Sequence, residues 1–166
     1  MGGGILPVTI VKGTIFFLLG RERSNNLWCD FGGSSLHRES SFHTAIREGY
    51  EELDGFLGDE DVLRKKVNNN YVNCFSTKHN RYTSYLFKME FEEMKHFVPC
   101  FNNHQTFITK NKLMKPVDSF YEKSEIKLFS YKDLEKNLHV IRPYYRTVVR
   151  QLIQNKETIY SELNLN

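Results

Sequence analysis

Three glutamates on one predicted helix have the type and spacing of metal ligands. Residues 41–54 contain no proline and several good helix formers, and they precede Gly55, which is suited to end a helix. On this helix Glu48, Glu51 and Glu52 lie three and four positions apart and share one face. Adjacent carboxylates repel one another unless a cation lies among them, and Mg²⁺ prefers oxygen ligands. The alternative interpretation is a solvated acidic helix face.

The residues before these acids favour the metal site. Gly33, Glu39 and Arg47 complete the pattern Gly-x5-Glu-x7-Arg-Glu-x2-Glu-Glu. Six fixed residue types at about 6% usage each coincide by chance on the order of once in 10⁵ chains of this length. The pattern, over residues 33–55, resembles the Nudix box of the Nudix hydrolase superfamily. It diverges slightly at Gly49, where the box has an aliphatic residue, and at Asp54, which delays the closing glycine by one position.

The resemblance implies an α/β fold: a Nudix-type α/β/α sandwich with a mixed β-sheet. A chain of 166 residues fits one domain with a core of its own, so we expect a single Nudix domain over residues 1–166. The apolar spacing from 143 to 164 predicts a C-terminal helix that packs on this core.

The resemblance also implies a set of site residues inside and beside the box. The implied metal ligands are the Gly32 carbonyl and the carboxylates of Glu48, Glu51 and Glu52. Glu51 and Glu52 are also expected to act on the attacking water. Glu39 and Arg47 have a supporting part, because a charge-assisted pair between them would hold the glycine loop against the helix.

Two further contributions are implied from outside the box. Nudix enzymes often use another acid from a Glu-x-x-Glu segment that precedes a strand, and Glu122 or Glu125 has that placement. The general base is therefore Glu52, Glu122 or Glu125. Arg23 lies where many relatives carry an arginine, and it is expected to bind a substrate phosphate.

These residues suit displacement at phosphorus assisted by Mg²⁺ or Mn²⁺. The resemblance implies a hydrolase that cleaves a pyrophosphate bond in a nucleoside diphosphate linked to another moiety. The substrate would be a nucleotide, a dinucleoside polyphosphate, another small polyphosphate such as a diphosphoinositol phosphate, or capped RNA. The alternative is a catalytically silent Nudix-fold module that binds nucleotide or RNA.

The composition is that of an intracellular, cytoplasmic protein without a membrane segment. Cys29, Cys74 and Cys100 are odd in number and have no Cys-x-x-Cys spacing, which argues against a disulfide framework and a zinc site. The apolar run at 15–19 is too short to span a bilayer. A formal charge of +3, with acids concentrated in the box, leaves the remaining chain basic and favours an anionic partner.

Alternating and β-branched segments predict the strands that would position the box. We expect them at 5–11, 14–19, 27–31, 71–75, 81–91 and shortly before 129, with a hairpin turn at Lys12-Gly13. Periodicity fails from 92 to 120, where the sequence predicts either a short helix at 92–97 or a functional loop. Candidate phosphate contacts in that segment are Lys95, His96, His104, Lys110, Lys112 and Lys115.

Overall fold

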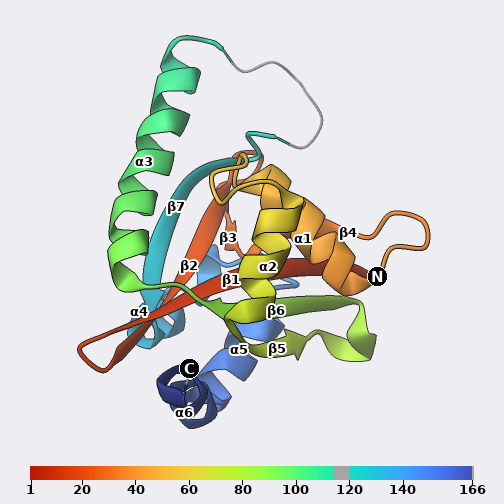
Figure 1. Cartoon of the computed structure of the whole chain (residues 1–166), viewed down its shortest axis with the longest axis vertical. Coiled ribbons are helices and arrows are strands. Elements are labelled where there is room, and N and C mark those ends of the chain that lie inside the picture. Colours follow the sequence, from red (N-terminus) through yellow and green to blue (C-terminus); the bar gives the residue numbers. More distant parts are fainter. Residues whose placement is uncertain (114–119, 166) are drawn as a thin grey trace.

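A seven-stranded mixed sheet forms the centre of the protein in a computed structural model, which describes residues 1–113 and 120–165 (Figure 1). The strands are β1 (Gly2–Val11), β2 (Thr14–Glu22), β3 (Trp28–Cys29), β4 (Phe31–Ser34), β5 (Tyr71–Ser76), β6 (Tyr82–Lys88) and β7 (Lys123–Ser130). Their main order is β3-β2-β1-β6-β5, with β4 paired to β1 and β7 paired to β2. β1 is parallel to β6 and antiparallel to β2 and β4, so the sheet is mixed as expected.

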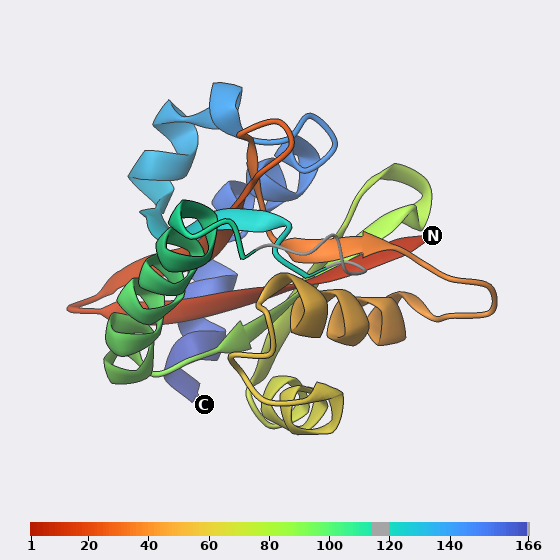
Figure 2. The same cartoon turned by 90° about the horizontal axis from the view of Figure 1, so that it is seen from above.

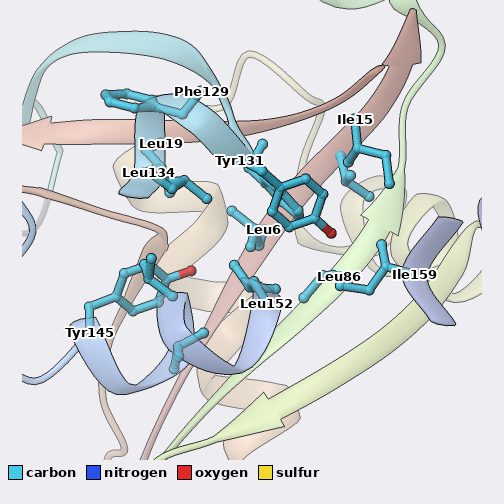
Figure 3. Close-up of a cluster of buried hydrophobic side chains, with 14 of the residues drawn as sticks. Leu6, Ile15, Leu19, Leu86, Phe129, Tyr131, Leu134, Tyr145, Leu152 and Ile159 are labelled. Carbon is cyan, nitrogen blue, oxygen red and sulfur yellow. The ribbon is translucent and has the colours of Figure 1, made fainter. Parts of the chain in front are cut away.

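Helices cover both faces of this sheet. They are α1 (Ser41–Glu52), α2 (Glu60–Asn69), α3 (Phe91–Lys110), α4 (Tyr131–Lys136), α5 (Arg146–Gln154) and α6 (Lys156–Leu165). Figure 2 shows α1 and α2 together on one side of the strands. Alternation along β1 separates two cores, because Ile5 packs with α1, α2 and α3, whereas Leu6 packs with α5 and α6. Part of the second core, with Leu6, Tyr145 and Leu152, is drawn in Figure 3. The α/β/α sandwich is confirmed.

Local sequence explains the hairpin and the start of α1. Lys12 and Gly13 both have positive φ, at 49° and 76°, as a two-residue hairpin turn requires. The Ser40 hydroxyl accepts a hydrogen bond from the His43 N–H at 3.2 Å and so caps α1.

Two segments differ from the sequence-based expectation. Residues 91–110 form one helix, α3, although Pro99 lies inside it. The buried side chains of α3 keep a helical spacing, but one of them is the polar Gln105, which hides the apolar stripe from a sequence pattern. The single C-terminal helix expected from about 143 to 164 is two helices, α5 and α6, because α5 already ends at its C-cap Asn155. Lys115 lies outside the described residues.

The unusual glycine of the box lets α1 approach the sheet closely. A Cβ on Gly49 would lie 2.5 Å from Cδ1 and 2.7 Å from Cγ1 of Ile5, so the side chain of Ile5 fills the space that a larger residue would occupy. Ile5 is fully buried and cannot swing into solvent. The sequence divergence at Gly49 is therefore compensated by packing.

Gly49→Leu is expected to destabilise the protein by at least about 1–3 kcal/mol, because the added side chain overlaps Ile5. Ile5→Ala alone is expected to cost about 2–5 kcal/mol through the cavity that it leaves. The double variant should be more stable than the sum of the two effects predicts, by about 1 kcal/mol or more in urea unfolding. Strict additivity would show that the two positions do not share this space.

Candidate active site

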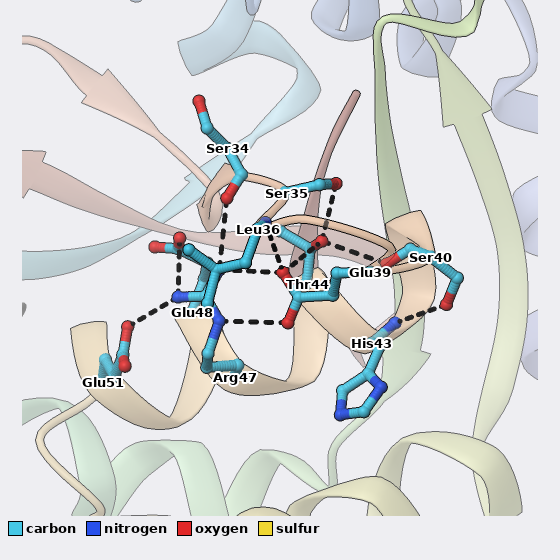
Figure 4. Close-up of polar contacts among 10 residues, drawn as sticks. All are labelled: Ser34, Ser35, Leu36, Glu39, Ser40, His43, Thr44, Arg47, Glu48 and Glu51. Carbon is cyan, nitrogen blue, oxygen red and sulfur yellow. Dashed lines mark hydrogen bonds and ion pairs between the residues drawn. The ribbon is translucent and has the colours of Figure 1, made fainter.

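Arg47 of α1 ties the end of β4 and the segment that follows it to the helix (Figure 4). Its guanidinium donates two hydrogen bonds of 3.1 Å to the Glu39 carboxylate and one of 3.1 Å to the Ser34 carbonyl. It also contacts Glu48 at 2.9 Å and Glu51 at 3.0 Å. Hydrogen bonding to Arg47 lowers the pKa of Glu39 to about 2. One cation therefore holds three carboxylates of the box together.

A second group of acids meets at the end of α1. Glu22 from β2, Glu52 from α1 and Glu122, just before β7, each place a carboxylate oxygen within 4.8 Å of the others. Glu52 is 2% exposed; burial raises its pKa, and the nearby charge of Lys123 opposes that rise. Its Oε2 accepts a hydrogen bond of 2.7 Å from the Gly32 N–H. Glu48 lies close to both Glu52 and Glu122. Beyond the effect of burial, repulsion from Glu122 contributes to the raised pKa of Glu48, and repulsion from Glu48 contributes to the raised pKa of Glu52.

Lys123 is the buried cation within this second group. Its side chain has no exposed surface, and its Nζ lies 2.6 Å from Glu22 and 3.1 Å from Glu52. The Cys29 sulfur is a further neighbour at 3.2 Å. Burial alone would lower the pKa of Lys123, but the neighbouring acidic groups outweigh it and raise that pKa well above its usual value. Gly20 leaves room for the lysine, since a Cβ there would lie 2.8 Å from the Lys123 Cδ.

Sequence reasoning missed Glu22 and Lys123. The signal for Glu22 is weak: it is a single acid at the end of the apolar strand 14–22, before the box begins at Gly33. Lys123 adjoins the predicted acid Glu122, but its burial follows only from the pairing of β7 with β2, which brings Lys123 opposite Glu22.

The structure separates the two candidate acids outside the box. Glu122 belongs to the group around Glu52, and burial raises its pKa. Glu125 lies opposite Arg21 in the β2–β7 pairing and forms an ion pair with it at 3.0 Å. Both side chains of that pair are 37% exposed and lie outside the acidic group.

Arg23 contacts α3 and the segment before β7. Its guanidinium donates to the Tyr121 carbonyl at 3.0 Å, to Gln105 Oε1 at 2.9 Å and to the Thr109 hydroxyl at 3.2 Å. These bonds support the chain that carries Glu122. Binding of a substrate phosphate by Arg23 stays a prediction.

Asp54, the additional residue of the box, also helps to hold the segment before β7. Its backbone has a positive φ of 50°, and Gly55 follows at 69°, so two residues share the left-handed end of α1. The Asp54 carboxylate accepts hydrogen bonds from the Tyr121 N–H at 2.8 Å and from the side chain of Gln105. Because Gln105 also accepts from Arg23, the insertion connects the end of the box to the segment that positions Glu122 and Lys123.

The two glycines expected in a loop lie in the strand β4, paired with two glycines of β1, and both are required for close approach. A Cβ on Gly33 would lie 2.5 Å from the Glu48 carboxylate, and one on Gly32 would lie 2.3 Å from the Tyr82 hydroxyl. The strand β4 therefore passes close to the acids of α1. This donor set, made of carboxylates beside a glycine-rich strand, fits a hard divalent cation such as Mg²⁺ or Mn²⁺.

Glu39→Gln should reduce stability at neutral pH by about 1–2 kcal/mol, because it weakens charge-assisted hydrogen bonds to Arg47. The folded pKa of Glu39, about 2, lies below its ordinary value of 4.5. The wild-type advantage should therefore be complete above 4.5 and shrink as the pH falls from 4.5 towards 2. Urea unfolding of both proteins across this range measures the difference. A difference that does not change with pH would contradict the assignment.

Known structures with a similar fold were found, although no protein-family model and no curated protein sequence matches the chain. A Caenorhabditis elegans Ap4A hydrolase in a binary complex aligns with a TM-score of 0.56 and 14% identity, over 95% of this chain and 98% of that one. The Nudix hydrolase RenU of Mycobacterium smegmatis aligns with a TM-score of 0.54 and 11% identity, over 95% and 86%.

A third similar structure contains a nucleotide and a metal. It is a bifunctional NMN adenylyltransferase/ADP-ribose pyrophosphatase from Francisella tularensis in complex with AMP and a manganese ion. Its TM-score is 0.52 and its identity 13%, over 92% of this chain and 41% of that one.

No helix among residues 1–113 and 120–165 is long and apolar enough to cross a membrane. The chain has the fold of the Nudix hydrolases.

Proposed function

We propose that the protein is a hydrolase that depends on Mg²⁺ or Mn²⁺ and cleaves a pyrophosphate bond in a nucleoside diphosphate linked to another moiety. The observation that carries this proposal is the meeting of Glu22, Glu52 and Glu122 beside Glu48 and Gly32 of β4. The similar structures named as an Ap4A hydrolase and as an ADP-ribose pyrophosphatase support the reaction class.

Different residues of this chain would bind the metal ion and position its ligands. Glu48 and Glu52, with the Gly32 carbonyl, would hold the metal ion, and Glu51 would hold a further ion or polarise the water. When bound, such an ion neutralises phosphate charge and lowers the pKa of a water molecule. Lys123 fixes the orientation of Glu52 through the contact of 3.1 Å, and Arg47 fixes Glu48 and Glu51.

Glu122 is the proposed general base. Glu122 is exposed as a whole residue, whereas both oxygens of Glu52 are already engaged by Lys123 and Gly32. Partial burial of the Glu122 carboxylate, and then the charge of Glu22, raise the pKa of Glu122, which brings it closer to the range in which a base accepts protons at neutral pH. Glu125, paired with Arg21, is not assigned to the reaction.

One observation favours the second candidate, a silent binding module. Lys123 already compensates Glu22 and Glu52 with a built-in positive charge, so the acids at the end of α1 are stable without a metal ion. A titration with Mn²⁺ separates the candidates, because the hydrolase requires binding of the ion at Glu48 and Glu52.

Glu52→Gln is expected to abolish turnover while the protein stays folded, since the amide keeps the shape but loses the charge. Glu122→Gln should lower kcat by about 10²–10⁴-fold if Glu122 is the base. The matched control, Glu125→Gln, should keep activity close to wild type because its partner Arg21 lies outside the site. The assay incubates each protein with Mg²⁺ and a panel of nucleotides, dinucleoside polyphosphates, diphosphoinositol phosphates and capped RNA, with products identified by mass.

Full activity of Glu52→Gln would contradict the mechanism. Loss of activity in Glu125→Gln together with normal activity in Glu122→Gln would move the base to the other acid. Nucleotide binding without release of any phosphate product, by a wild-type protein that also fails to bind Mn²⁺, would favour the silent module.

A further inference from the structure

A large depression adjoins β4, the strand whose Gly32 bonds to Glu52 of the acidic group. Its volume is about 1010 Å³, and it lies between the turn that joins β5 to β6 and the start of α5. Gly32 and Gly33 form part of its wall. Small-molecule sites have volumes of about 300–1,000 Å³, so this depression has the size of a small-molecule site.

The charge of this depression is opposite to that of the acidic group. Lys78, His79 and Arg81 come from the β5–β6 turn, and Arg142 comes from the segment before α5. None of its lining residues, within the described part of the chain, is an aspartate or a glutamate. Lys78 and Arg81 are exposed and form no ion pair with any residue in 1–113 or 120–165. Their charges are available to a ligand.

Two contacts connect the depression directly to the acidic group. Gly32 lines the depression and donates its N–H to Glu52. Arg142 lines it as well, and its Nη1 lies 3.0 Å from Glu22. Both contacts place the basic wall of the depression beside the acidic group, so a substrate that extends from the acids across β4 would meet basic side chains.

The aromatic side chains of the depression do not form a slot for a nucleobase. The rings of Tyr82 and Tyr144 contact each other edge to face, with centroids 5.2 Å apart, so no flat ring fits between them. The Arg142 guanidinium lies over the Tyr144 ring at 5.0 Å, which holds this cation at the wall. The Tyr82 hydroxyl donates to the buried Asp30 at 2.6 Å and is turned away from a ligand.

We infer that this depression is an anion subsite for phosphate groups on the part of the substrate that is not cleaved. This inference rests on the proposed hydrolase function and narrows it: the substrate is a small molecule that carries phosphate beyond the cleaved pyrophosphate. The lysines predicted for this task, on residues 92–112, come from α3 and the residues after it, and none of them lines the depression.

The test measures binding of inorganic tripolyphosphate by calorimetry, without metal ions and at low ionic strength. Lys78→Glu/Arg81→Glu reverses two unpaired charges and should weaken binding at least tenfold. The control Lys65→Glu/Lys132→Glu makes the same change in net charge at exposed lysines of α2 and α4, and it should stay within about twofold of wild type. Circular dichroism checks that each variant is folded.

Equal weakening by the two double variants would overturn the inference, as would absence of tripolyphosphate binding by the wild type. Two further probes identify the ligand class. Binding of uncharged adenosine that depends on Lys78 and Arg81 would assign a nucleoside to the depression. If Lys78→Glu/Arg81→Glu weakened binding of a short single-stranded RNA but not of tripolyphosphate, the depression would be assigned to a nucleic acid. Either result would overturn the proposal that its ligand is a small polyphosphate.

Failure of this inference is distinguishable from failure of the proposed hydrolysis. Tripolyphosphate binding is measured without metal and without turnover, whereas the hydrolase is tested by product release and by Glu52→Gln. A protein that hydrolyses nucleotides but binds tripolyphosphate equally well in all variants would contradict the subsite alone.

Discussion

The buried contact of Lys123 with Glu22 and Glu52 determines how the acidic residues are arranged. Burying a charge is costly unless an opposite charge and hydrogen bonds compensate it. Here one ammonium group lies 2.6 Å from one carboxylate and 3.1 Å from the other, in a position without exposed surface. Removing the lysine would leave two carboxylates close together and largely cut off from water. The contacts of Lys123 therefore allow α1 to end against the sheet with Glu52, its last residue, buried.

Three parts of the chain have to meet for this contact to form. β2 brings Glu22 and, at Gly20, leaves the space for the lysine stem, α1 brings Glu52, and the start of β7 brings Lys123. The segment before β7 is held by a chain of hydrogen bonds from Asp54 through Gln105 to Arg23. The insertion in the box is thus part of the support of the site. On the other side, Arg47 gives the same kind of compensation to Glu39, Glu48 and Glu51.

The part of the site that is local in sequence could be predicted. The box spacing led to the helix and to the Glu39–Arg47 pair, because each follows from distances of a few residues along the chain, whereas the glycines expected in a loop lie in β4 because they pair with β1. Glu22 and Lys123 are 101 positions apart, and only the pairing of β2 with β7 brings them together. The same pairing separates Glu122 from Glu125, which no spacing rule distinguishes. The sequence predicted at most a short helix at 92–97, and the full length of α3 escaped prediction because Pro99 and the buried Gln105 interrupt its apolar pattern.

The most direct measurement is the position of a metal ion in crystals soaked with Mn²⁺, located by its anomalous scattering. The proposed function predicts a peak bounded by the carboxylates of Glu48 and Glu52 and the Gly32 carbonyl, with Lys123 still paired to Glu22. The Glu52→Gln protein, soaked in the same way, should lose or weaken this peak. Absence of manganese from these residues in the wild-type crystals, while tripolyphosphate or a nucleotide binds, would contradict a metal-dependent hydrolase.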